Sequence, residues 1–274
     1  MAFHPQEDHH CGPASLLTLL DHAGVRADYA SVVERVYVPG LEGSLQIEMA
    51  AAGRSFGRLA YALPPEPAAV LAEVAAGRPV LVLLNLGVPS SPVWHYAVVV
   101  GFDPAANRFV LRSGAERRLL RKAPVWLRQW DWAGRWALVL LAPGEWPAAP
   151  RRDRLLRALA DFEEIADAAS AGRAWRRAAA AWPDEPLAWL GVGNAAYRRE
   201  AWDDAAEAYR HALSLDPEHL PARLNLAQAE AEGGSPCSGL AVLGPPPAAG
   251  HPLLPAFAEV REMLRRRCAA TRAG

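Results

Sequence analysis

Hydrophobic periodicity divides the chain near residue 143. In the first part, apolar residues recur at helical spacing over 13–24 and 64–79, and each run ends near a glycine, which favours helix termination. Four short runs rich in Val and Leu, each bounded by turn residues, predict strands at 79–86, 94–102, 108–113 and 135–143. A tryptophan-rich segment at 124–134 is expected to cover the sheet. These elements predict an α+β fold over residues 1–143, with helices packed on an antiparallel sheet.

From residue 152 onward the chain is rich in alanine and its pattern is helical throughout. Residues 186–219 resemble the tetratricopeptide repeat, a 34-residue helix pair whose small and large side chains interlock. The matching positions are Trp189, Gly193, Ala205, Tyr209, Ala212 and Pro217. Ala196 departs from the pattern, because an aromatic residue is usual there. The resemblance implies about three repeats and a capping helix over 152–274, after a linker at 144–151.

Charge and apolar content exclude several classes of protein. The 274 residues include 29 basic and 30 acidic side chains, so the formal net charge is −1 and general attraction to nucleic acid or to an anionic membrane is not expected. No apolar run reaches the roughly 18 residues that span a bilayer. Three cysteines are too few for a disulfide framework, and only Cys237 and Cys268 are candidates to pair.

Candidate chemistry begins at Cys11, in the stretch QEDHHCGPAS. Pro13 is tolerated in the first turn of a helix, so Cys11 is expected at a helix N-terminus. The positive end of the helix dipole there favours a thiolate, which is the nucleophilic form of cysteine. Gly12 is expected to let a substrate backbone approach closely. A buried, unreactive thiol and a metal ligand are the other interpretations.

A nucleophilic cysteine needs a base, and His95 is the candidate. His9 and His10 adjoin Cys11, but neighbouring side chains project in divergent directions. His95 opens an apolar strand and is expected to meet the sulfur from another part of the fold. The alternatives are a histidine that only caps its strand, and a zinc site built from His9, His10 and Cys11, which lacks further ligands at a typical spacing.

These motifs resemble the papain-like cysteine peptidases of the bacteriocin-processing, double-glycine-leader type, over about residues 3–141. In that family a glutamine stands five residues before the catalytic cysteine, as Gln6 does here. The resemblance implies that Cys11 attacks a peptide carbonyl, that His95 holds and delivers the proton, and that Gln6 and the Cys11 N–H stabilise the oxyanion. It implies a peptide or protein substrate, no cofactor and no metal.

The family's histidine is usually oriented by an aspartate, and here the pattern departs. Asp103 lies too far along the same strand to serve. If Phe102 pairs with Arg108, the hairpin places Ser113 diagonally beside His95 on the same face. Ser113 is therefore the predicted orienting residue, although it carries no charge. The fallback candidates are Asn85 and Glu116.

Three outcomes stay open for this site: hydrolysis, transfer of the acyl group to an amine, and peptide binding without catalysis. The repeat region is expected to bind a protein substrate or partner, or only to stabilise the first domain. The family resemblance implies a bacterial protein. Relatives are often exported, so a periplasmic location with the signal segment removed and a cytoplasmic location both remain open.

Overall fold

The computed structural model describes residues 3–5 and 10–273, and its contacts divide the chain into two compact units, Met1–Ala166 and Asp167–Gly274. The helices of the first unit are α1 (Cys11–His22), α2 (Tyr29–Val36), the short 3₁₀ helix η1 (Pro39–Leu41), α3 (Gln46–Ser55), α4 (Pro67–Ala75), α5 (Ala123–Asp131) and α6 (Arg152–Glu163). The strands are β1 (Leu59–Ala62), β2 (Val80–Asn85), β3 (Trp94–Asp103), β4 (Arg108–Ser113), β5 (Glu116–Lys122) and β6 (Ala137–Leu141). The four predicted strands are confirmed as β2, β3, β4 and β6.

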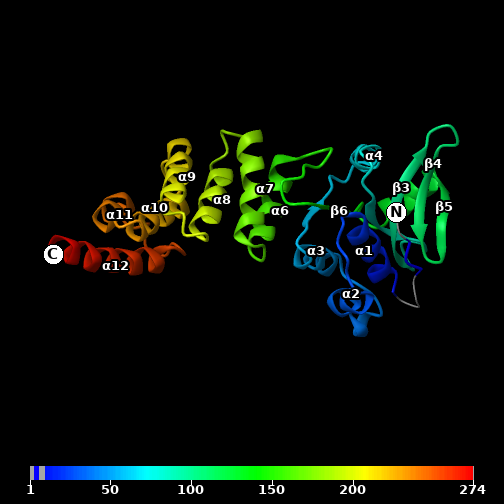
Figure 1. The fold of residues 1–274 in the computed structure, drawn as a ribbon. Coiled ribbons are helices and arrows are strands. Elements are labelled where there is room, and N and C mark those ends of the chain that lie inside the picture. The colour runs from blue at the N-terminus through cyan, green and yellow to red at the C-terminus, as the bar shows by residue number, and fades with distance from the viewer. Residues whose placement is uncertain (1–2, 6–9, 274) are drawn as a thin grey trace. The chain divides into compact units, whose positions relative to one another are not determined.

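One six-stranded antiparallel sheet organises the first unit, with the strand order β1-β6-β2-β3-β4-β5 (Figure 1). Alternate residues of β3 serve opposite faces. Val98 packs in the cluster formed with the leucines of α1, whereas Val99 points to the other face. On that second face Trp126 of α5 stacks on Phe109 with ring centroids 4.0 Å apart. The α+β prediction is confirmed at this level.

The second unit contains only helices among its described residues. They are α7 (Ala168–Ala181), α8 (Pro186–Tyr197), α9 (Trp202–Leu215), α10 (Leu220–Glu232), α11 (Pro236–Leu243) and α12 (Leu254–Ala273). Close approach depends on glycine, because a Cβ at Gly191 would collide with the Trp175 ring and one at Gly193 with the Tyr209 ring. Small residues on α8 therefore receive large side chains from the helices on either side of it in sequence, which is ordinary ridge-and-groove helix packing.

The boundary between the units lies later than the sequence predicts. Segment 144–151 was expected to be a linker, but polar contacts attach it to the first unit. The Ala148 N–H donates to Glu73, which is fully buried, at 2.7 Å, and the Arg151 N–H donates to the Tyr61 hydroxyl at 3.0 Å. Helix α6 packs against β1 and buries Phe162. It therefore belongs to the first unit rather than to the repeat region.

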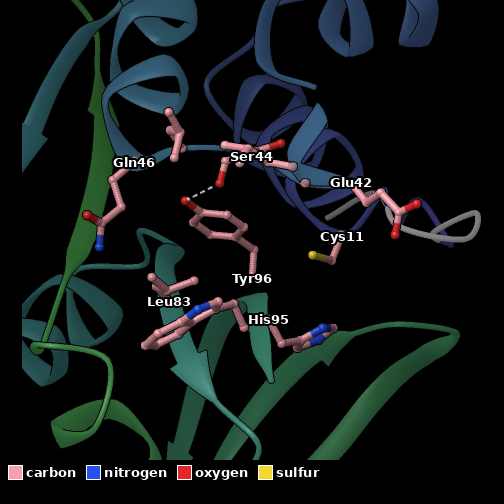
Figure 2. Close-up of a pocket in the computed structure, with 11 residues that line it drawn as sticks. Cys11, Glu42, Ser44, Gln46, Leu83, His95 and Tyr96 are labelled. Carbon is pink, nitrogen blue, oxygen red and sulfur yellow. Dashed lines mark hydrogen bonds between the residues drawn. The ribbon is translucent and has the colours of Figure 1, made fainter. Parts of the chain in front are cut away.

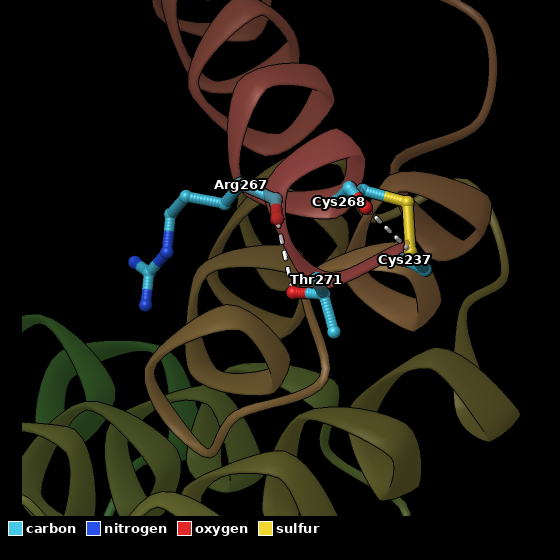
Figure 3. The surroundings of a disulfide bond; sticks show 4 residues. All are labelled: Cys237, Arg267, Cys268 and Thr271. Atoms are coloured by element: carbon cyan, nitrogen blue, oxygen red, sulfur yellow. Dashed lines mark hydrogen bonds between the residues drawn. A yellow bond between two sulfur atoms is a disulfide. The ribbon is translucent and has the colours of Figure 1, made fainter. Parts of the chain in front are cut away.

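A disulfide joins Cys237 of α11 to Cys268 of α12, as Figure 3 shows. The two cysteines are 31 residues apart in sequence, so the bond closes the loop that leads into the last helix. Cys11 is a free cysteine. None of the helices in the described part of the chain is both long enough and apolar enough to cross a membrane.

Candidate functional site

Cys11 is the first residue of α1 and lines a cavity of about 700 Å³. The walls are formed by the segment after η1, by Leu83 of β2 and by the start of β3. Figure 2 shows the Cys11 sulfur, the Tyr96 ring and the His95 ring around this opening. The lining residues are Cys11, Leu41, Glu42, Gly43, Ser44, Leu45, Gln46, Leu83, Trp94, His95 and Tyr96. The sequence candidates Cys11 and His95, which are 84 positions apart, thus share one cavity.

Ser113 is the hydrogen-bond partner of His95. The distance between Nε2 of the ring and Oγ of Ser113 is 2.8 Å. This contact leaves the other ring nitrogen, Nδ1, to face a reaction partner. A serine hydroxyl both donates and accepts hydrogen bonds, so it does not by itself decide which ring nitrogen carries the proton.

The predicted register between β3 and β4, from which Ser113 was chosen, was only partly right. Phe102 pairs with Phe109 rather than with Arg108, one position away from the prediction. A β-bulge between Val99 and Gly101 then restores the expected register, because Val98 pairs with Arg112. The bulge therefore offsets the error in the turn, and His95 reaches the predicted side chain.

No hydrogen bond joins Cys11 and His95, both of which lie within the described residues. The backbone N–H of Tyr96 instead acts on the sulfur and opposes the rise in the pKa of the Cys11 thiol. The cysteine and the histidine therefore line the same cavity without forming an ion pair.

Burial favours the neutral forms of Cys11 and His95. Desolvation raises the pKa of the Cys11 thiol, against the opposing effect of the Tyr96, Gly12 and Cys11 backbone N–H groups. Desolvation, followed by the positive charge of Arg121, lowers the pKa of His95. The N–H groups at the helix N-terminus lower the pKa as expected, but loss of hydration outweighs them, so the net shift does not favour the thiolate.

Tyr96 and Ser44 complete the site and were not identified from sequence. Tyr96 donates through its hydroxyl to the Ser44 carbonyl at 3.2 Å (Figure 2). The Tyr96 carbonyl accepts from the Ser15 hydroxyl of α1 at 3.3 Å. A Cβ at Gly12 would collide with the Ser44 side chain, so Gly12 admits this serine and not a substrate backbone as expected. The Ser44 hydroxyl is buried without a hydrogen-bond partner. Only the position of Tyr96 beside His95 could have signalled its role.

The remaining candidates do not orient His95. Asp103 accepts the Ala106 N–H at 3.1 Å and stabilises a turn. Asn85 accepts the Gly87 and Val93 N–H groups, each at 3.0 Å, and holds the loop before β3. Glu116 is exposed and pairs in register with Ser113.

The zinc interpretation finds no support in the described part of the chain, where no group of three or more His, Cys, Asp or Glu side chains could hold a metal ion. His10 turns toward α2, with Nδ1 3.2 Å from the Tyr29 hydroxyl. Gln6 and His9 lie outside the described residues. The oxyanion assignment to Gln6 therefore remains a prediction.

Comparison with known proteins does not assign this chain. No protein-family model and no curated protein matches it. The resemblance to cysteine peptidases and to tetratricopeptide repeats therefore rests on the motifs and on the geometry described above.

Proposed function

We propose that the first unit is a cysteine-type peptidase of papain-like fold that cleaves a peptide or protein substrate through Cys11 and His95. The hydrogen bond between His95 and Ser113, at the wall of the cavity that contains Cys11, carries the proposal. A nucleophile, a base and a residue that orients the base are the parts that acyl transfer by a thiol requires.

The neutral resting groups favour a general-base mechanism. His95, whose Nε2–H donates a hydrogen bond to Ser113, takes the thiol proton through Nδ1 as the sulfur attacks the substrate carbonyl. The carbonyl oxygen becomes an oxyanion, which the Cys11 N–H and the predicted Gln6 amide stabilise. His95 returns the proton to the leaving amine, and water releases the acyl group from the sulfur.

A peptide-binding module without catalysis is the second candidate. The raised pKa of Cys11, the absence of a hydrogen bond to His95 and the uncharged orienting residue all favour it. Such a module would hold an extended peptide in the same cavity and leave it intact. Transfer of the acyl group to an amine instead of water is a variant of the first proposal.

For the second unit we propose a small tetratricopeptide array that recruits a protein substrate or partner. The packing of Trp175 on Gly191 and of Tyr209 on Gly193 supports it, because this is the interlocking expected between repeat helices. The disulfide between Cys237 and Cys268 supports an oxidising location such as the periplasm.

Covalent capture tests the catalytic proposal. Cys11 is the free cysteine, so a peptidyl electrophile that mimics a scissile carbonyl has one reactive target in the unreduced protein. We expect mass spectrometry to find the adduct on Cys11, together with cleavage of a mixed peptide library, and both to disappear in Cys11→Ala.

His95→Ala should lose cleavage, whereas His10→Ala should keep it, because His10 contacts α2 instead of the cavity. Peptide binding with neither adduct nor cleavage would select the binding module.

A further inference from the structure

The hairpin formed by β4 and β5 concentrates positive charge. Residues 108–122 contain six basic side chains and one acidic side chain, a net charge of +5 within a chain whose net charge is −1. The basic residues are Arg108, Arg112, Arg117, Arg118, Arg121 and Lys122. They are called the basic hairpin below.

Most of the charge of the basic hairpin is not compensated within the described residues. Elsewhere in the first unit arginines have carboxylate partners, as in the contacts between Arg78 and Glu73 and between Arg135 and Asp131. Apart from Arg112, the basic hairpin has five basic residues, and among the described residues none of the five forms an ion pair with a carboxylate. The exposed ones, Arg117, Arg118 and Lys122, have their charge available to a partner.

Like charges also face one another in this hairpin. Arg108 lies directly opposite Lys122 in the register of β4 and β5. Burial lowers the pKa of Arg112, and the nearby positive charge of Arg117 lowers it further. Like charges at facing positions destabilise a sheet, so the fold itself does not account for this arrangement.

The hairpin is also the open end of the sheet. β5 is the last strand in the order, and no described residue pairs with its outer edge. Regular pairing from Leu119 to Lys122 places Arg121 on one face of β5 and Lys122 on the other, and a register shift interrupts the alternation at Arg117 and Arg118. An edge strand presents a row of unpaired N–H and C=O groups that a further strand can pair with.

We propose that β5 binds an extended acidic peptide, which joins the sheet as a seventh strand. The open edge supplies main-chain hydrogen bonds, and the cations on both faces supply complementary charge for acidic side chains on both faces of the added strand. A second copy of this chain is a poor occupant because its β5 carries the same charge. The proposal is independent of the peptidase chemistry.

Fluorescence anisotropy tests the proposal. The full chain carrying Cys11→Ala, which prevents turnover, is titrated against a fluorescein-labelled peptide in which Glu alternates with Val and Thr. Binding is expected to weaken with added salt, and about fivefold or more in the double variant Arg117→Gln/Arg118→Gln, because two cross-strand charge pairs are lost. The control Arg154→Gln/Arg157→Gln removes two exposed arginines from α6 and should leave the affinity unchanged.

Two further probes separate strand addition from simple charge attraction. The same peptide with alternate backbone nitrogens methylated keeps its charge but loses hydrogen bonds, and it should bind much more weakly. Equal binding of the methylated peptide would overturn strand addition.

Tighter binding of a single-stranded oligonucleotide, lost in the same double variant, would overturn the peptide as the partner. Unchanged peptide affinity in the double variant would show that the cations only prevent edge-to-edge pairing, which also overturns the proposal.

Discussion

Replacing Ser113 with aspartate changes the electrostatics of the candidate site at its most sensitive contact. The Ser113 hydroxyl lies 2.8 Å from Nε2 of His95, so a carboxylate in its place would face the ring directly. Opposite unit charges about 4 Å apart interact by roughly 4 kcal/mol at an effective dielectric constant near 20. Burying the carboxylate offsets part of this energy, and we expect the pKa of His95 to rise by about one to two units.

A protonated ring beside the sulfur also favours the thiolate. Each unit of pKa corresponds to about 1.4 kcal/mol, so the ion pair that wild type lacks would gain roughly 1 to 3 kcal/mol. The pH midpoint for alkylation of Cys11 by iodoacetamide should therefore fall in Ser113→Asp. If the protein is a peptidase, cleavage should rise about tenfold, the factor that 1.4 kcal/mol represents.

The titration of the His95 ring by NMR and the alkylation profile of Cys11 are the two assays. Ser235→Asp provides the control, because it adds the same charge at the exposed start of α11, where aspartate is tolerated. Ser113→Ala should remove the contact without adding charge. An unchanged His95 titration in Ser113→Asp would refute the claim that the 2.8 Å contact controls the ring.

Four further outcomes follow from the same contacts. Wild-type Cys11 should be alkylated with a midpoint above the ordinary thiol value of about 8.5, since burial raises its pKa, and a lower midpoint would contradict this. Tyr96→Phe loses one hydrogen bond and should lower the free energy of unfolding of the first unit by about 1 kcal/mol in urea titrations. Reducing the Cys237–Cys268 disulfide should destabilise the second unit by about 3 to 4 kcal/mol, seen as a lower Tm of that unit alone. Because the folded pKa of His95 lies below its unfolded value of about 6.5, its contribution to stability is complete above pH 6.5 and is lost as pH falls through the folded pKa. His95→Gln should flatten that loss in urea titrations across pH.

Much of the sheet could be predicted because its central strands are buried on both faces. β2, β3 and β6 are nearly continuous apolar runs, and such runs are typical of strands. β1 was missed because four residues give no readable alternation. β5 was missed because its sequence, ERRLLRK, is mostly charged, and only pairing with β4 makes it a strand.

The parts of the candidate site whose positions are fixed by chain order and strand geometry could be predicted. The parts whose positions are fixed by packing could not. Cys11, His95 and Ser113 follow from a helix start, a strand start and a hairpin register. The contact of Tyr96 with Ser44 depends on the segment after η1 lying against Gly12 of α1, which no local pattern signals.

The direction of the hydrogen bond between Ser113 and His95 decides whether the site can work as a peptidase. When Ser113 accepts a hydrogen bond from the Nε2–H group, Nδ1 has a free lone pair and can take the thiol proton. When Ser113 donates to Nε2, the proton lies on Nδ1 and His95 cannot act as a base toward Cys11. An aspartate accepts only, so it would remove the second state, whereas serine permits both. A peptidase with serine here therefore works from a fraction of its molecules, and a binding module has no need of the choice. The response of cleavage to Ser113→Asp separates the two: a peptidase gains activity, and a module whose cavity lacks another catalytic part gains an ionised cysteine but no turnover.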